Sequence, residues 1–139
     1  MPTFEIRGQR LPVPLRRSVA IRLTRWLRER GVPPAHVTVH FEEQPPNSVF
    51  SGGLPVEALG GSGSDLPYAS VVCRISPDRP ETFRRELAAE LADALGAGPG
   101  TGYLSIEFRP TRPDHVYVWR SDALVRADRL ADPERMLSQ

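Results

Sequence analysis

Residues 68–108, YASVVCRISPDRPETFRRELAAELADALGAGPGTGYLSIEF, decide the fold. The run YASVVCRI at residues 68–75 is apolar and rich in β-branched residues, which is typical of a buried strand. A helix is predicted from Pro80 to Gly96, because proline suits the first helical turn and glycine the end. Its apolar positions share one face: Phe83, Leu87, Leu91 and Leu95. GYLSIEF at residues 102–108 predicts a second strand, so the stretch forms one β-α-β unit.

The beginning of the chain repeats this order. PTFEIR at residues 2–7 alternates apolar and polar residues, as a half-buried strand does. Pro14 fits the first turn of a helix that stops at Gly31. The apolar residues of this helix recur at helical spacing: Leu15, Val19, Leu23 and Trp26. HVTVHFE at residues 36–42 alternates again, so a second β-α-β unit is predicted.

The glycine-rich stretch SGGLPVEALGGSGSDLP, residues 51–67, separates the two units. We expect a single domain over residues 1–139, with β-α-β halves at 2–53 and 66–120. Residues 121–139 are expected to form a C-terminal tail, in which DALVRADRLADPERMLSQ at residues 122–139 has helical character.

This tandem order predicts an α+β fold. Each unit joins a parallel strand pair by a right-handed crossover, and the two pairs form one mixed sheet with both helices on one face. The other face of the sheet is left uncovered. Since a half-covered sheet needs a partner surface, we expect the chain to form an oligomer.

Composition excludes several classes of protein. The single cysteine, Cys73, rules out an internal disulfide, and its apolar strand predicts a buried thiol. No apolar run has the length of a membrane span, and the N-terminus lacks the pattern of a signal peptide, so a cytoplasmic protein without membrane contact is expected. All 18 basic residues are arginine, which suggests a GC-rich bacterial coding sequence.

Metal, nucleotide and nucleic-acid sites are not predicted. His36, His40 and His115 are scattered without the spacing of a metal site, and nucleotide-binding glycine motifs are absent. The best case for nucleic-acid binding is the basic face of the first helix, formed by Arg16, Arg17, Arg22, Arg25, Arg28 and Arg30. The net charge is only +1, however, so a solvated helix face is the preferred interpretation.

The nitrogen of the second residue, Pro2, is a candidate reactive group. If Met1 is cleaved, Pro2 becomes a secondary amine with a pKa near that of an α-amino group, roughly 8, and burial lowers it further. Such an amine can act as a general base at neutral pH. If Met1 is retained, the Pro2 nitrogen is an amide without a basic lone pair.

Three features together resemble the tautomerase superfamily: the proline ahead of a strand, the doubled β-α-β unit, and FEEQPPNSVFSGG at residues 41–53. The resemblance covers residues 2–120 and is closest to the cis-3-chloroacrylic acid dehalogenase branch. It implies a homotrimer and an enzyme without cofactors, in which the prolyl nitrogen is the catalytic acid or base. It also implies cations that hold the carboxylate of a small substrate.

The resemblance assigns further residues to the site. In CRISPDRP it points to Arg79 and, more loosely, Arg74 as carboxylate-binding residues; the alternatives are a solvated helix-start residue and a strand-end charge. Arg10 matches an arginine that short family members use. Phe50 either packs in its loop or lies at the mouth of the site. The remaining candidates, by position in the last strands, are Tyr103 and Tyr117.

The sequence also departs from the family pattern. Leu27 or Arg28 stands where the dehalogenase branch has a histidine, and Tyr117 stands near its water-activating glutamate. Val32 replaces the active-site lysine of macrophage migration inhibitory factor. These departures argue against dehalogenation and hydration. They leave an isomerase that acts on a small 2-keto, enol or unsaturated carboxylic acid, or a non-catalytic scaffold, especially if Met1 is retained.

Overall fold

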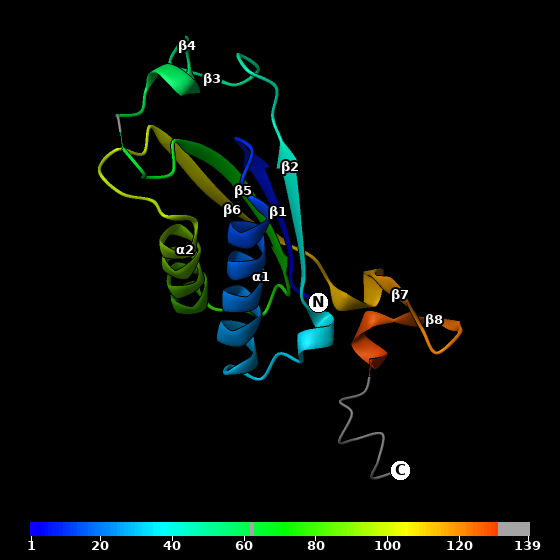
Figure 1. The fold of residues 1–139 in the computed structure, drawn as a ribbon. Coiled ribbons are helices and arrows are strands. Elements are labelled where there is room, and N and C mark those ends of the chain that lie inside the picture. Colours follow the sequence, from blue (N-terminus) through cyan, green and yellow to red (C-terminus); the bar gives the residue numbers. More distant parts are fainter. Residues whose placement is uncertain (62, 131–139) are drawn as a thin grey trace.

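The computed structural model describes residues 1–61 and 63–130 (Figure 1). The first half contains β1 (Thr3–Gly8), α1 (Val13–Arg28), β2 (Thr38–Glu43), β3 (Phe50–Ser51) and β4 (Leu54–Pro55). The second half contains β5 (Tyr68–Ile75), α2 (Glu81–Leu95), β6 (Tyr103–Pro110), β7 (Tyr117–Arg120) and β8 (Ala123–Arg126). Each half is therefore a β-α-β unit followed by a short hairpin.

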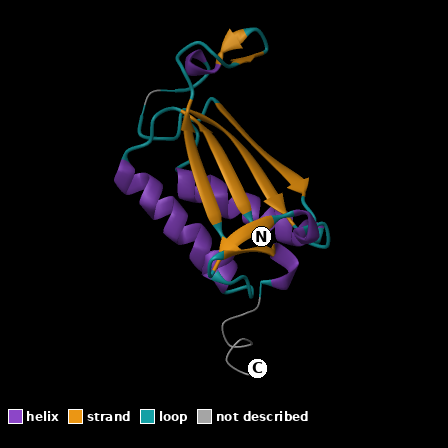
Figure 2. Cartoon of the chain, turned by 90° about the vertical axis from the view of Figure 1, so that its right-hand side faces the viewer, coloured by secondary structure: helices purple, strands orange, loops and turns teal. Residues whose placement is uncertain are grey.

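The main sheet has the strand order β2-β1-β5-β6. Strands β1 and β2 are parallel, as are β5 and β6, whereas β1 and β5 are antiparallel. Both helices cover one face of this sheet (Figure 2). The predicted α+β fold, with a mixed sheet and two helices on one face, is confirmed.

The core lies between the sheet and the helices. Helix α1 contributes Val19, Leu23, Trp26 and Leu27, and α2 contributes Leu87, Leu91 and Leu95. Alternate residues of β1 and β5 pack against them, among them Phe4, Ile6, Val71 and Cys73. The prediction of a buried thiol is confirmed, and burial raises the pKa of Cys73 to about 12.

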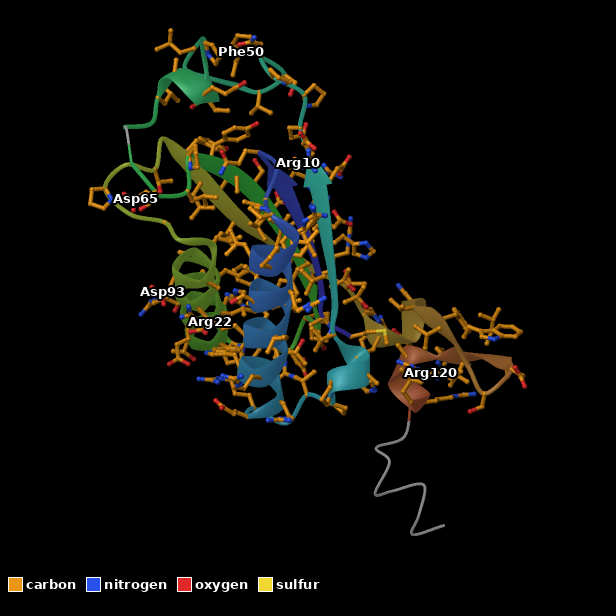
Figure 3. The ribbon with its side chains drawn as sticks, viewed as in Figure 1. Arg10, Arg22, Phe50, Asp65, Asp93 and Arg120 are labelled. Carbon is orange, nitrogen blue, oxygen red and sulfur yellow. The ribbon has the colours of Figure 1, made fainter. Side chains whose placement is uncertain are left out.

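Part of the basic face of α1 is used inside the molecule. Arg22 binds Glu90 at 2.6 Å and also Asp93, and so ties α1 to α2 (Figure 3). Arg30 lies over the ring of Trp26, with its guanidinium carbon 3.5 Å from the ring centroid. These arginines stabilise helix packing.

Two segments differ in structure from the sequence prediction. Pro34–His36 form a 3-10 turn, so β2 begins at Thr38. The helical prediction for the C-terminal segment is wrong at Ala123–Arg126, which form β8. Ser121 and Asp122 both have positive φ, as the two-residue turn between antiparallel strands requires. The rest of the predicted tail, residues 131–139, lies outside the described residues.

Candidate functional site at the N-terminus

Pro2 is fixed at the start of β1. It is buried, and its carbonyl oxygen accepts a hydrogen bond of 3.1 Å from the backbone N–H of Thr38. Because Thr38 begins β2, the strand pair itself positions the proline. Met1, ahead of it, is half-buried.

The environment favours a neutral amine at this end of the chain. The pKa of the N-terminal amine, which Met1 carries here, lies below its ordinary value of 8.0. Burial is the larger cause, and the positive charge of Arg79 is the second. Both disfavour the protonated form. A terminal amine at this end therefore stays neutral down to a lower pH than an exposed one.

Arg79 is held in place by aromatic and backbone contacts. Its guanidinium carbon lies 4.6 Å from the ring centroid of Phe83, and that ring packs edge-on against Trp26. The carbonyl oxygen of Arg79 accepts a hydrogen bond of 2.7 Å from Arg84. Phe83 was predicted only as a core residue. Its position four residues after Arg79 at the start of a helix was the available signal for this contact.

Arg74 lies at the same end of the sheet in a different environment. Its Cα is the partner of Thr3, next to Pro2, in the antiparallel β1–β5 pair. Its Nε lies 3.4 Å from the Oε1 of Glu5. Glu5 was not among the predicted site residues, although strand alternation places Thr3 and Glu5 together on the face opposite Pro2. Arg74 thus has an acidic partner on the uncovered face of the sheet.

Three other predicted site residues lie at the opposite end of the sheet from Pro2. Arg10 follows the end of β1, and Phe50 lies on the β3–β4 hairpin (Figure 3). Tyr103 begins β6 and is the Cα partner of Tyr68 at the start of β5. Because β1 and β5 run in opposite directions, the start of β5 lies beside the end of β1. A single copy of the chain does not bring these three residues to Pro2.

Tyr117 lies nearer the proline end of the molecule. It begins β7, and its side chain is exposed. The hairpin of β7 and β8 is connected to the segment before β2 by a hydrogen bond of 2.5 Å from Nη2 of Arg120 to the carbonyl of Ala35. Tyr117 is therefore on a hairpin that contacts, through Arg120, the segment leading into β2.

A small cavity of about 50 Å³ lies at the end opposite Pro2, where its lining includes Arg10, Arg16, Phe41 and Tyr68. Residues 1–61 and 63–130 contain no group of three or more His, Cys, Asp or Glu side chains that could hold a metal ion. No helix in the same ranges is long and apolar enough to cross a membrane.

The sequence matches no family model and no curated protein. Several solved structures have a fold similar to that of this chain. A native fused 4-OT is 20% identical, with a TM-score of 0.63 over 90% of this chain and 97% of its own. Pt0534 inactivated by 2-oxo-3-pentynoate is 16% identical, with a TM-score of 0.67 over 94% and 99%. N1, a member of the cis-3-chloroacrylic acid dehalogenase (cis-CaaD) family, is 15% identical, with a TM-score of 0.61 over 88% and 82%. The chain therefore has the fold of the tautomerase superfamily.

Proposed function

We propose that the chain is a cofactor-independent tautomerase-superfamily enzyme whose base is the nitrogen of Pro2 after removal of Met1. Its substrate is a small 2-keto, enol or unsaturated carboxylic acid. The observation that carries the proposal is the environment at this end of the chain, where burial and the positive charge of Arg79 lower the pKa of the terminal amine that Met1 carries. The same surroundings favour the neutral form of a Pro2 amine, which is the form that accepts a proton.

The proposed reaction transfers one proton. In the conversion of an enol acid to its keto form, the Pro2 nitrogen accepts the proton of the enol hydroxyl as the carbonyl forms. The protonated nitrogen then delivers a proton to the adjacent carbon, where the C–H bond forms. The nitrogen ends in its starting state, so the reaction needs no further reagent.

Arg79 is the proposed residue for binding the substrate carboxylate. A guanidinium offers two parallel N–H donors, which match the two oxygens of a carboxylate. Its charge also stabilises the negative charge that develops on the substrate when the hydroxyl proton leaves. Arg74 is the weaker candidate because Glu5 already lies 3.4 Å from its Nε.

We propose a homotrimer, in which neighbouring copies supply the residues that one copy leaves far from Pro2. Fused 4-OT structures similar to this chain are trimers, with TM-scores of 0.60 and 0.64. The uncovered face of the main sheet supports an assembly of this kind. In the trimer, Arg10, Phe50 and Tyr103 of one copy are candidates for the site of another, and Tyr117 borders it.

A covalent probe tests the proposed base. Since 2-oxo-3-pentynoate inactivates the structurally similar Pt0534, the same compound is a suitable electrophile for a neutral amine at Pro2. We expect intact mass to show loss of Met1 and addition of one probe molecule, located on the peptide that begins with Pro2. Ketonisation of phenylenolpyruvate should be lost in parallel.

The control is a variant with one additional residue ahead of Pro2, whose prolyl nitrogen is an amide. It should be neither labelled at Pro2 nor active. Labelling elsewhere with full loss of activity would contradict the assignment of the base. A native chain that retains Met1 and is inactive would instead support a non-catalytic scaffold.

A further inference from the structure

Arg79 and Arg74 lie near the same end of the sheet, but their guanidinium groups have different partners. Arg74 lies 3.4 Å from a carboxylate oxygen of Glu5. Arg79 forms no such salt bridge in the part of the chain that the structure describes, and its guanidinium carbon lies 4.6 Å from the ring centroid of Phe83. A carboxylate cancels the charge of a nearby guanidinium, whereas the face of a ring attracts that charge without cancelling it. Arg79 therefore keeps its positive charge for other groups.

The ring of Phe83 is itself fixed by the neighbouring helix. Its centroid lies 5.3 Å from that of Trp26, and the two rings meet edge to face at 62°. Trp26 is a buried residue of α1, and Phe83 belongs to α2, which lies beside α1 (Figure 1). Because rings packed in this way attract each other, Trp26 limits the rotation of the Phe83 ring. The orientation of Arg79 thus depends on both helices.

The backbone contact of Arg79 does not fix its side chain. The carbonyl oxygen of Arg79 accepts a hydrogen bond of 2.7 Å from Arg84, which holds the main chain ahead of α2. The acidic neighbour Asp78 has another partner: a hydrogen bond with Ser76 is the largest cause of the lowered pKa of its carboxyl, and the charge of Arg79 is a lesser one. An arginine side chain has many rotamers, so a contact is needed to select one of them. Phe83 provides that contact.

We propose that Phe83 is a positioning residue of the N-terminal site. Its ring, supported by Trp26, holds the charge of Arg79 beside the terminal amine and leaves the guanidinium N–H donors free for a substrate carboxylate. Without the ring, the guanidinium samples other rotamers and its charge lies farther from the amine on average. The effect on substrate binding rests on the proposed function, whereas the effect on the terminal amine does not.

Titration of the terminal amine tests this role without any assay of activity. The rate at which the amine is acylated, followed by mass spectrometry of the N-terminal peptide between about pH 5 and 9, gives the pKa of the amine. Phe83→Leu keeps an apolar side chain but removes the ring, so the pKa should rise towards that of Arg79→Ala. Phe83→Tyr keeps the ring and should retain the pKa of the wild type.

Two controls separate positioning from general loosening of the core. In the Arg79→Ala background, Phe83→Leu should cause no further rise in the pKa of the amine, because the ring acts through Arg79. Phe41→Leu is the same change in a ring that packs against the same core from β2. It should leave the pKa of the terminal amine at the wild-type value. Circular dichroism should show that all variants keep the fold.

Steady-state kinetics with phenylenolpyruvate test the effect on substrate binding, at a pH where the amine is neutral. Phe83→Leu should raise KM by about 2- to 30-fold with a smaller change in kcat, and Phe83→Tyr should restore KM. The proposal is overturned if Phe83→Leu keeps the wild-type pKa of the amine, or if it shifts that pKa equally in the presence and absence of Arg79. An inactive wild type would contradict the proposed function alone, since the titration still decides the role of Phe83.

Discussion

The two halves of the sheet share a backbone plan and differ in the chemistry of their first residue. Pro2 precedes β1 and Pro67 precedes β5. The carbonyl of Pro2 accepts a hydrogen bond from Thr38 at 3.1 Å, and that of Pro67 accepts one from Gly102 at 2.8 Å. Each bond connects the start of one strand to the start of its parallel neighbour. The Pro67 nitrogen, however, is an internal amide, so only Pro2 can become an amine.

The loop arginines follow the same symmetry. Arg79 follows β5 and acts on the N-terminal amine at the start of β1. Arg10 follows β1 and lies at the end of the sheet where β5 starts. The antiparallel contact of β1 with β5 thus gives each proline an arginine from the other half. The two ends of the sheet therefore have similar backbones, and they differ chemically in the covalent state of one prolyl nitrogen.

Blocking the Pro2 nitrogen should have the largest effect. An additional residue ahead of Pro2 should lower kcat/KM for phenylenolpyruvate by roughly 10²–10⁴-fold, the usual contribution of a general base. Pro2→Ala leaves a primary amine after processing and should retain a fraction of the activity. Pro67→Ala, the matched change in the other half, should alter kcat/KM by less than about threefold, because an amide nitrogen takes no part. Equal losses at Pro2 and Pro67 would show that the free nitrogen of Pro2 has no special role.

Substitution of Arg79 should have the next largest effect on kcat/KM. Arg79→Ala should lower kcat/KM by about 10- to 100-fold, mainly through KM, as expected for a charge-assisted hydrogen bond of roughly 1.5–3 kcal/mol. Arg79→Lys should restore only part of this loss, because an ammonium lacks the two parallel donors. Steady-state kinetics would show both effects.

Arg10→Ala tests whether a neighbouring copy contributes to the site. KM near that of the wild type would show that Arg10 takes no part, contrary to its proposed place in the trimer. A loss as large as that of Arg79→Ala would show that Arg10 acts on Pro2 of a neighbouring copy. If kcat and KM are unchanged in both Arg79→Ala and Arg10→Ala, Arg79 is a solvated surface residue with no role in substrate binding.

Substitutions in the loop before β6 should have a smaller effect, and that effect is on the free energy of unfolding. Gly102 precedes β6, and an added Cβ there would lie 2.7 Å from the backbone carbon of Leu59. Val37 precedes β2 in the first half, where the chain forms a proline-rich turn. Gly102→Ala should therefore lower the free energy of unfolding by about 1–3 kcal/mol. Gly61→Ala, with its closest contact at 3.4 Å, is the control and should change it little. Urea denaturation would measure both, and equal stabilities would contradict the packing argument.

The regular elements of the fold could be predicted from the sequence, whereas the hairpins could not. The β5 run at residues 68–75 and the leucine spacing of α2 gave clear periodicities, and both elements lie where the patterns placed them. Strands β3 and β4 have two residues each, too few for any period. The turn between β7 and β8 consists of Ser121 and Asp122 and lacks the glycine that usually marks such turns.

The candidate site could be predicted only in part for a related reason. The place of Pro2 behind Met1 singled it out, the resemblance to the tautomerase superfamily pointed to Arg79, and the electrostatic effect of Arg79 on the terminal amine fits that pairing. The roles of Pro2, Arg79 and the other site residues stay predictions. The contact between Arg74 and Glu5 depends on the register of β1 with β5, and the proximity of Arg79 to the N-terminal amine depends on the antiparallel direction of these two strands. Register and strand direction are set by contacts between distant segments, so a local sequence pattern does not predict them.

The pH dependence of kcat/KM for ketonisation shows whether the Pro2 nitrogen is the base, and it is measured on protein whose intact mass shows the loss of Met1. The rate should rise with pH through one pKa below the ordinary 8.0 of a terminal amine, because only the neutral nitrogen accepts a proton. In Arg79→Ala the nearby positive charge is gone, so the pKa should rise and the profile should move to higher pH. A rate that does not depend on pH between about 5 and 9, or an identical profile in Arg79→Ala, would contradict the account.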